Sequence, residues 1–284
     1  MTLRDYFHLP IEAMYNTSRI PSDFHSHLDY EIYYFHSGKC TYLVGDKIYE
    51  LEPGDLILMN GMTLHYPKVS SDLEYCRTII HFNRSYAEGL LKPPFLSTDA
   101  LQPFEGMNNI RISTTLEDRK LLEPLLDKLC HLYLHEDSLS HDRFLTAFME
   151  LLMQIREIAD RPNVREAPVI GLKQSNMGRI ISYIENHYTE EITLDDLVHH
   201  MHLNKYYLVK LFKEMTGITL FHYIYQRRIN QAKVLFTMHP DQTVTEVAYQ
   251  VGFKHGSHFS QTFKKFTGIP PDEYRKHLTA PEWR

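Results

Sequence analysis

Two histidines and a carboxylate lie close together in the stretch FHSHLDYE, residues 24–31. His25, His27 and Glu31 have the same parity, so one face of a continuous strand could carry all three. With His65 from a later strand they would form a three-histidine, one-carboxylate set suited to iron, manganese, nickel or zinc. The same groups could instead line a pocket for an organic ligand, or be polar residues with only a structural role.

The size and composition of the chain narrow these choices. Its 284 residues, 43% hydrophobic and 23% charged, are typical of a globular protein with two domains of ordinary size. The start, MTLRDYFHLP, lacks the basic and apolar regions of a signal peptide, and the sequence has no run of eighteen apolar residues. Three widely spaced cysteines without a CxxC pair indicate reduced thiols. We therefore expect a cytoplasmic protein with no membrane partner.

The first half of the chain is predicted to be all-β. Short runs of β-branched and aromatic residues alternate with turn residues such as Gly38-Lys39 and Asn60-Gly61. The predicted strands are EIYYFHS, CTYLV, KIYEL, DLILM and CRTIIHF. Short strands at this spacing indicate a sandwich or a small barrel.

Helical periodicity follows at residues 116–136 and 138–160. Pro124 predicts that the first of these helices begins late or is kinked at that point. The second carries an apolar stripe, which could pack on its own sheet or join two chains in a dimer, and the pattern alone does not choose. Residues 161–175 contain two prolines and a glycine without periodicity, which indicates a linker.

The second half contains an internal repeat, because FKEMTGI and FKKFTGI are offset by 51 residues. Thr193 and Thr243, offset by 50 residues, each begin a T-x-x-[DE] capping box at the start of a short helix. One extra residue therefore lies in the turn of the second copy. Asn204 and Ser257 are expected to cap the second helix of each copy. A short helix, a tight turn and a second helix make a helix-turn-helix, which is present twice.

The exposed faces of the two second helices are predicted to contact DNA. Their early positions can enter a major groove and reach base edges, and their later lysines suit phosphates. The candidate DNA-contacting residues are Asn204, Lys205, Tyr206, Lys210, Lys213, His255, Ser257, His258, Gln261, Lys264 and Lys265. Residues 173–284 hold 14 Lys and Arg against 11 Asp and Glu, whereas the rest of the chain is acidic, which is compatible with DNA binding.

The segment between the copies, GITLFHYIYQRRINQAKVLF, is predicted to be a helix that links the two units. Leu220, Ile224 and Ile229 belong to its packed side, and Arg227 and Arg228 fall on another. A helix of roughly twenty residues spans about 30 Å, close to the roughly 34 Å between successive major-groove segments on one face of DNA.

Residues 176–274 resemble the DNA-binding domain of the AraC/XylS family of bacterial transcription regulators, through YLVKLFKEMTG and VTEVAYQVGFKHGSHFSQTFKKFTGIPPDEYR. The resemblance implies seven helices with two helix-turn-helix units, whose recognition helices would be 204–215 and 257–267. It also implies an activator more often than a repressor, with double-stranded promoter or operator DNA and RNA polymerase as partners. We expect a homodimer in which the helices that follow the barrel pair two chains. Val209 departs from the family, which often has a small polar residue there.

Residues 25–38 match H-x-H-x3-E-x6-G, the first motif of cupin barrels, and LEPGDLILMNGMTLHYP resembles the second motif. The resemblance implies a cupin-like barrel. Two departures bear on a metal: Arg19 replaces the leading glycine, and His65 lies farther from Gly54 than in metal-binding cupins. Sensor domains of AraC-like regulators often resemble this motif and use the cavity for a small organic ligand.

We therefore predict a two-domain transcription regulator, not an enzyme, and expect no cofactor. Residues 1–160 would form the cupin-like sensor barrel with its following helices, 161–175 the linker, and 176–276 the DNA-binding domain. The sequence has no Gly-rich phosphate loop after a strand, no G-x-S-x-G elbow and no cysteine in a recognised nucleophile motif, so we assign no catalytic residue.

The effector pocket is predicted to combine polar and aromatic groups that suit a sugar or a similar polar ligand. Its residues would be His25, His27, Glu31, Tyr33, Tyr42 and His65. The tyrosines could equally be packing residues of the barrel. The alternative is a metal-dependent cupin enzyme, or a metal sensor, fused to the DNA-binding domain, with the three histidines and Glu31 as ligands.

Overall fold

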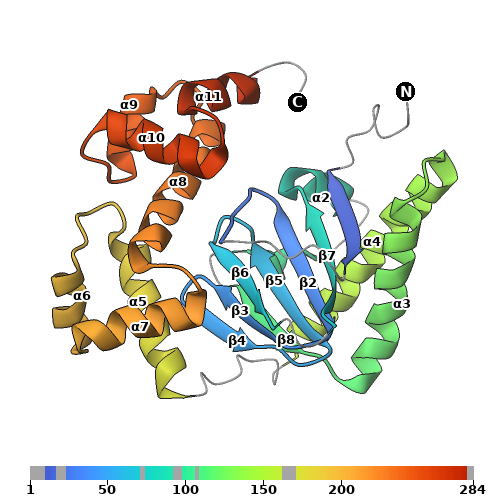
Figure 1. The fold of residues 1–284 in the computed structure, drawn as a ribbon. Helices are drawn as coiled ribbons and strands as arrows, with labels where there is room; N and C mark the ends of the chain where they lie inside the picture. The colour runs from blue at the N-terminus through green and yellow to red at the C-terminus, as the bar shows by residue number, and fades with distance from the viewer. Residues whose placement is uncertain are drawn as a thin grey trace.

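The structure is a computed structural model that describes residues 10–16, 24–70, 74–91, 98–105, 109–161 and 171–279 (Figure 1). Its amino-terminal part contains two antiparallel sheets, with strand orders β1-β7-β2-β5-β8 and β4-β3-β6. The strands are β1 (Ile11–Asn16), β2 (Tyr30–Ser37), β3 (Cys40–Val44), β4 (Lys47–Glu50), β5 (Asp55–Asn60), β6 (His65–Val69), β7 (Cys76–Phe82) and β8 (Ile110–Ser113). All five predicted strands are present, so the prediction of a β-rich first domain is confirmed.

Alternation along β2 divides the core of this domain into two layers. Tyr33 and Phe35 point into the space between the two sheets, where they pack with residues of β3, β4 and β5. Ile32 and Tyr34 point to the other face of the larger sheet. Because successive side chains of a strand alternate between faces, one strand serves both layers.

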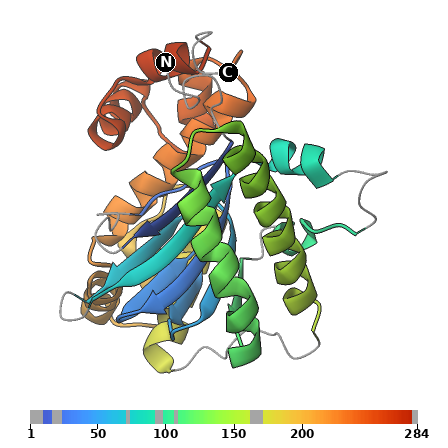
Figure 2. The same ribbon diagram turned by 90° about the vertical axis from the view of Figure 1, so that its right-hand side faces the viewer.

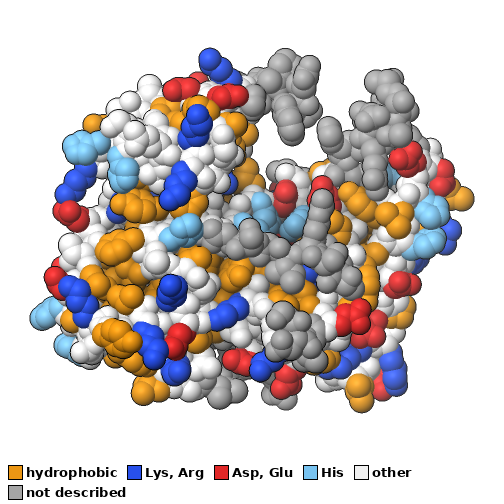
Figure 3. Space-filling model, in the orientation of Figure 1, with side chains coloured by type: hydrophobic (Ala, Val, Ile, Leu, Met, Phe, Trp, Pro, Cys, Tyr) orange, Lys and Arg blue, Asp and Glu red, His pale blue; other side chains and the backbone are white. Residues whose placement is uncertain are grey.

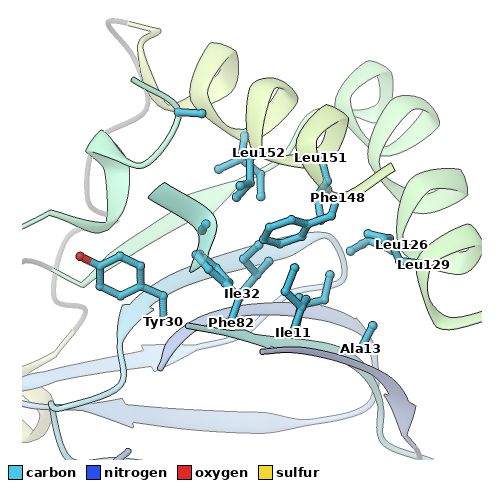
Figure 4. Packing of buried hydrophobic residues seen from close by; sticks show 14 of the residues in the cluster. Ile11, Ala13, Tyr30, Ile32, Phe82, Leu126, Leu129, Phe148, Leu151 and Leu152 are labelled. Atoms are coloured by element: carbon cyan, nitrogen blue, oxygen red, sulfur yellow. The ribbon is translucent and has the colours of Figure 1, made fainter. Parts of the chain in front are cut away.

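Two helices cover the outer face of the larger sheet, α3 (Leu116–Tyr133) and α4 (Ser138–Ala159), as Figure 2 shows. The smaller helices α2 (Arg84–Leu91) and η1 (Gln102–Phe104) border them. Figure 4 shows Phe148, Leu151 and Leu152 of α4 packed over the side chains of the sheet. The apolar stripe of α4 therefore packs on its own sheet.

The expected late start of α3 at Pro124 is wrong. The helix begins at Leu116, after a capping box between Thr115 and Asp118, and continues past Pro124 as one element. Leu122 and Leu126 on either side of the proline are buried against the sheet. The cap and this packing offset the backbone hydrogen bond that proline cannot donate.

Seven helices make up the described residues 171–279, as the family resemblance implies. They are α5 (Leu172–His187), α6 (Leu194–Met201), α7 (Lys205–Thr216), α8 (Leu220–Met238), α9 (Val244–Gln250), α10 (Gly256–Thr267) and α11 (Pro271–Thr279). In Figure 1, α8 runs from the group α5–α7 to the group α9–α11. Helix α5 begins at Leu172, so the last four residues of the predicted linker 161–175 are helical; residues 162–170 lie outside the described part. No helix in the described part is both long and apolar enough to cross a membrane.

Candidate functional sites: a histidine–glutamate cluster and two recognition helices

A buried carboxylate lies at the centre of the histidine–glutamate cluster, which we define as His25, His27, Glu31, His65 and His81. Glu31, 1% exposed, is the second residue of β2. Its Oε2 atom lies 3.0 Å from Nε2 of His27, 3.0 Å from Nε2 of His81 and 3.4 Å from Nε2 of His65. The sequence prediction therefore placed four members correctly in one cluster and missed His81.

Three separate segments, not one continuous strand, bring the histidines to Glu31. His25 forms an isolated antiparallel bridge with His65 at the start of β6, and the chain bends at residues 28 and 29 before β2 begins. His81 arrives from β7, where it lies directly across from Glu31 in the β2–β7 pairing. The prediction grouped His25, His27 and Glu31 correctly, but its reason was wrong, because the three residues do not lie on one continuous strand. His81 could be found only by knowing which strands pair.

The ring orientation of two histidines is fixed by backbone carbonyls. Nδ1 of His27 donates to the carbonyl oxygen of Asp29 at 3.1 Å, and Nδ1 of His65 donates to that of Thr63 at 2.8 Å. In a neutral imidazole the other nitrogen then carries a lone pair, and both Nε2 atoms face the Glu31 carboxylate. Nε2 of the buried His65 lies 3.4 Å from Oε2 of Glu31. This arrangement favours a cation, either a proton or a metal ion, among these groups.

The electrostatics of the cluster agree with this geometry. Burial alone would raise the pKa of Glu31, but hydrogen bonds with His27, His65 and His81 outweigh it and hold the pKa well below its ordinary value. Burial alone would lower the pKa of His81, but the hydrogen bond with Glu31 and the negative charges of Glu31, Glu12 and Asp29 together outweigh it, and the net shift is upward. The site therefore stabilises the carboxylate form of Glu31 and the protonated form of His81.

The cluster is open to solvent on one side. His27 and His81 keep 23% and 24% of their side-chain surface accessible, whereas His65 is fully buried. Figure 3 shows histidine side chains near the middle of one face of the molecule, beside acidic ones. A small ligand could therefore reach Glu31 past two of its partners.

A glycine leaves room for one of these rings. Gly61, which follows β5, donates to the carbonyl oxygen of Asp29 at 3.1 Å and accepts from the backbone N–H of His27 at 2.8 Å. A Cβ atom at this position would overlap the His27 ring and the Asp29 carbonyl oxygen. Only glycine fits between the loop and the imidazole.

The two tyrosines predicted to contact an effector are both buried between the sheets. Their rings are 4.6 Å apart, and the Tyr33 hydroxyl is hydrogen-bonded to that of Tyr75. The Tyr42 ring lies parallel to that of His65, with a centroid distance of 6.5 Å. Tyr42 therefore borders the cluster directly, whereas Tyr33 belongs to the packed layer beneath it.

Both recognition helices lie within one residue of their predicted bounds, and all eleven predicted DNA-contacting residues are exposed. Asn204 caps α7 by accepting the backbone N–H groups of Tyr206 and Tyr207. The expected cap at Ser257 is wrong, because α10 begins at Gly256 and the position before it is His255, which makes no side-chain cap. With the 51-residue offset between FKEMTGI and FKKFTGI, His255 is the counterpart of Asn204, so Ser257 lies inside the first turn of α10.

Arg227 and Arg228 of the linking helix α8 are buried, which corrects their expected place on a non-packed face. Nε of Arg227 lies 2.7 Å from the Glu185 carboxylate, and its guanidinium stacks over the Tyr188 ring. Arg228 donates to the carbonyl oxygens of Tyr188 and Glu190, at 2.6 Å each. A charged group can be buried when ion pairs and carbonyls satisfy its donors. The two arginines tie α8 to α5 and to the loop that precedes α6.

Comparison with known proteins adds two matches that together span most of the chain. Residues 8–155 match the AraC-like ligand binding domain, and residues 197–277 match a helix-turn-helix domain. The first match alone covers more than half of the 284 residues. The chain belongs to the AraC family of transcription regulators. This family is the one that the motifs of the second half indicate.

Curated relatives align with this chain over most of its length. The HTH-type transcriptional activator RhaR of Cronobacter sakazakii is 23% identical over 97% of this chain and 95% of its own length. An uncharacterized HTH-type transcriptional regulator, YdeC of Bacillus subtilis, is 26% identical over 90% of this chain and 86% of its own length. A Staphylococcus aureus regulator is 26% identical over 78% of this chain, which spans only 28% of that longer protein.

Solved structures show more distant likeness. ToxT from Vibrio cholerae aligns over 95% of this chain and 99% of its own, with 18% identity and a TM-score of 0.39. The C-terminal domain of the response regulator yesN from Fusobacterium nucleatum aligns over 34% of this chain and 94% of its own, with 36% identity and a TM-score of 0.33.

Proposed function

We propose that this AraC-family regulator reads promoter DNA through α7 and α10 and binds its effector at the histidine–glutamate cluster. The proposal of DNA binding rests on one observation: each recognition helix has one buried apolar face and one exposed polar face. Leu208, Leu211 and Phe212 of α7, and Phe259 and Phe263 of α10, are buried. The opposite faces carry the predicted DNA-contacting residues and are all exposed. Such faces can enter successive major-groove segments.

Selection from a random duplex library, followed by gel shifts at several salt concentrations, tests this part. We expect the full-length protein to enrich a defined sequence that spans two groove segments. Binding should weaken as salt rises, because Lys and Arg release counterions from phosphates. If the selection recovers only unrelated sequences and binding depends steeply on salt, the protein binds DNA without sequence specificity. That outcome would contradict the proposal.

The effector is proposed to be a small polar molecule such as a sugar. Glu31 accepts hydrogen bonds, the imidazoles can donate or accept, and Tyr42 borders them with an aromatic ring. Hydroxyl groups, which both donate and accept, suit this set. A thermal-shift screen of sugars and small metabolites tests it, because a ligand of the folded state raises the melting temperature. The same shift should be absent in His81→Ala.

A second candidate effector is a divalent metal ion. The fixed Nδ1–H groups of His27 and His65 leave Nε2 of both rings directed at Glu31, as in sites where carbonyls orient metal ligands. His25, His27 and His65 form one group of donor atoms within 4.8 Å of one another, and His27, Glu31 and His81 form another. Elemental analysis of the purified protein decides between the candidates. Stoichiometric metal that a chelator removes together with DNA affinity would favour the ion.

The remaining parts of the proposal concern partners. The relative RhaR is a transcriptional activator by name, so we propose activation and a contact with RNA polymerase for this chain. A promoter-binding role is the basis for proposing a cytoplasmic location. A homodimer is proposed through the outer sides of α3 and α4, where leucines are 53–73% exposed. These leucines are Leu116, Leu121, Leu134 and Leu139. Sedimentation of Leu134→Glu against the unchanged chain tests the dimer.

A further inference from the structure

One short β-bridge has the histidine–glutamate cluster on one side and the DNA-binding domain on the other. The backbone N–H of His25 donates to the carbonyl of His65 at 3.1 Å, and the N–H of His65 donates to the carbonyl of His25 at 3.0 Å. Side chains alternate between the faces of an extended segment. His25 and His65 therefore turn to the cluster, and their neighbours Phe24 and Tyr66 turn away from it.

The outer side of the bridge packs directly on the linking helix α8. The Phe24 ring meets the edge of the Tyr223 ring at a centroid distance of 4.9 Å and lies 5.2 Å from that of Tyr66. The side-chain amide of Gln226 donates to the Phe24 carbonyl oxygen. Phe24 is 3% exposed and Tyr223 fully buried. No solvent layer separates this wall of the cluster from α8.

A second contact from the same strand reaches a recognition helix. Lys68, three residues after His65 in β6, donates from Nζ to the carbonyl oxygen of Glu214 in the last turn of α7. A cation at the carboxyl end of a helix interacts favourably with the helix dipole. Strand β6 thus carries a cluster histidine at its start and a link to α7 near its end.

We propose that the bridge of Phe24–His25 with His65–Tyr66 transmits the state of the cluster to α8, with Phe24 and Gln226 as positioning residues. The inference rests on the proposed effector site and names how that site is coupled to DNA reading. A displacement of His25 or His65 cannot be absorbed at Phe24, because close-packed interiors transmit small shifts. Helix α8 joins α7 to α10, so its position sets whether both reach the groove together.

A first test needs neither DNA nor a known ligand. The change Glu31→Gln alters the cluster from within, and hydrogen exchange of the full chain reports on α8. We expect exchange of the amides of residues 220–226 to change by about fivefold or more in Glu31→Gln, a typical size for coupling between sites. The change should fall below about twofold when Phe24→Leu or Gln226→Met is also present. Unaltered exchange in Glu31→Gln, or an equal change in all backgrounds, would overturn the proposal.

The second test is a double-mutant cycle on affinity for the selected duplex. Glu31→Gln should change the dissociation constant by about fivefold or more in the natural background and by less than about twofold in Gln226→Met. Met238→Ala, at the exposed far end of α8, is the matched control and should keep the full effect. Equal effects in all backgrounds, or none in any, would refute the coupling.

The two tests separate this inference from the proposed function. If the chain selects no DNA sequence, the proposed function fails, and the exchange experiment still decides whether the cluster and α8 are coupled. Gln226→Met removes one hydrogen bond and retains side-chain volume, so it decides the matter even if Phe24→Leu does not fold.

Discussion

The two helix-turn-helix units come from one repeated sequence but have different neighbours. The core around α6 and α7 includes Phe24, Leu43, Ile48 and Leu64 of the β domain. The core around α9 and α10 is made, in the part of the chain that the structure describes, by residues of α8–α11 and the turns between them. The first unit is therefore built partly from the sensor domain. In the described part of the chain, the core of the second unit contains no residue of that domain.

The recognition helices differ in charge pairing in a corresponding way. In α7, Nζ of Lys205 lies 2.9 Å from the Asp195 carboxylate, and Nζ of Lys210 lies 3.7 Å from that of Glu214. Within the described ranges, Lys264 and Lys265 of α10 have no carboxylate within 4.0 Å. Lys264 and Lys265 can therefore meet phosphates directly, whereas Lys205 and Lys210 must first exchange their carboxylate partners. We infer that the first unit is the regulated one and the second is the steadier DNA contact.

The largest expected effect is on the free energy of unfolding, when a buried phenylalanine is removed from the core around α7 or from the core around α10. Phe212→Ala and Phe259→Ala should each lower the free energy of unfolding by about 3–5 kcal/mol, because each empties a fully buried site. Phe212 contacts Tyr223, which in turn contacts Phe24, so its loss should also reduce protection of the β domain around residues 24–27. Phe259→Ala should leave that segment unchanged. Region-resolved hydrogen exchange measures both, and equal loss around residues 24–27 would erase the proposed difference.

Two turn glycines give the next test. Gly217 and Gly252 both have positive φ, 81° and 89°, so alanine costs about 1–2 kcal/mol at either position. A Cβ at Gly252 would also lie 2.6 Å from the backbone oxygen of Thr189, in the loop before α6, whereas one at Gly217 meets nothing within 4 Å. Gly252→Ala should therefore cost about 1–3 kcal/mol more than Gly217→Ala. Urea midpoints with unchanged slopes would measure the difference, and similar midpoints would contradict it.

Base reading is the third comparison. Gln261→Ala in α10 should weaken binding to the selected sequence by about 1–3 kcal/mol and relax specificity at one base pair. Lys210→Ala in α7 should weaken all sequences alike and by less, since Lys210 is already paired. Binding to single-position sequence variants separates these outcomes. Uniform weakening by Gln261→Ala would show that Gln261 contacts the backbone of DNA.

A smaller effect should follow from releasing a paired lysine. Asp195→Asn removes the exposed partner of Lys205, a pair that contributes about 0.2–1 kcal/mol. DNA affinity should rise severalfold, and the salt dependence should steepen by about one ion. Asp241→Asn, another exposed carboxylate of the same domain that is absent from the ion pairs of the described chain, is the control. If both variants bind DNA with the same affinity, the ion pair with Asp195 does not limit the contact of Lys205 with phosphate.

The smallest effect should be common to both units. A hydrogen bond from the Thr193 hydroxyl, and then one from its backbone N–H, lowers the pKa of Asp196; the backbone N–H and then the hydroxyl of Thr243 lower that of Glu246. A pKa lower in the folded state means stability that is present above the unfolded value and lost as pH falls through the folded value. Helix content below pH 4 should fall in step for both units. Asn at 196 or Gln at 246 should remove this dependence from its own unit only.

Sequence alone predicts the features that depend on local rules. The capping boxes at Thr193 and Thr243 and the helix-ending glycines at 217 and 268 are all present, because each depends on residues within one or two turns. The five predicted strands follow from their own alternation and turns. The late start predicted at Pro124 failed because packing against the sheet outweighs a local preference.

The candidate sites show where local rules end. His81 joins Glu31 only through the pairing of β2 with β7, strands that are distant in sequence. Arg227 and Arg228 are buried because Glu185 and two backbone carbonyls satisfy them, and no periodicity in α8 signals those partners. Tyr33 and Tyr42 are both tyrosines in predicted strands, and the sequence does not distinguish them, but only Tyr42 borders the cluster. In each case the position of the residue depends on contacts with residues that are distant in sequence.

Gly61 gives the regulator a point at which its sensitivity could be set without replacing any of the proposed ligand-binding residues. A methyl group there would push the His27 ring away from Glu31, since the loop carbonyl of Asp29 blocks the alternative. Glu31 would then keep His65 and His81 as neighbours but lose His27, one of its two partly exposed partners. Gly61→Ala should therefore weaken the response to the proposed effector while the recognition helices remain intact. A residue outside the predicted ligand-contacting set would then determine how strongly the regulator responds.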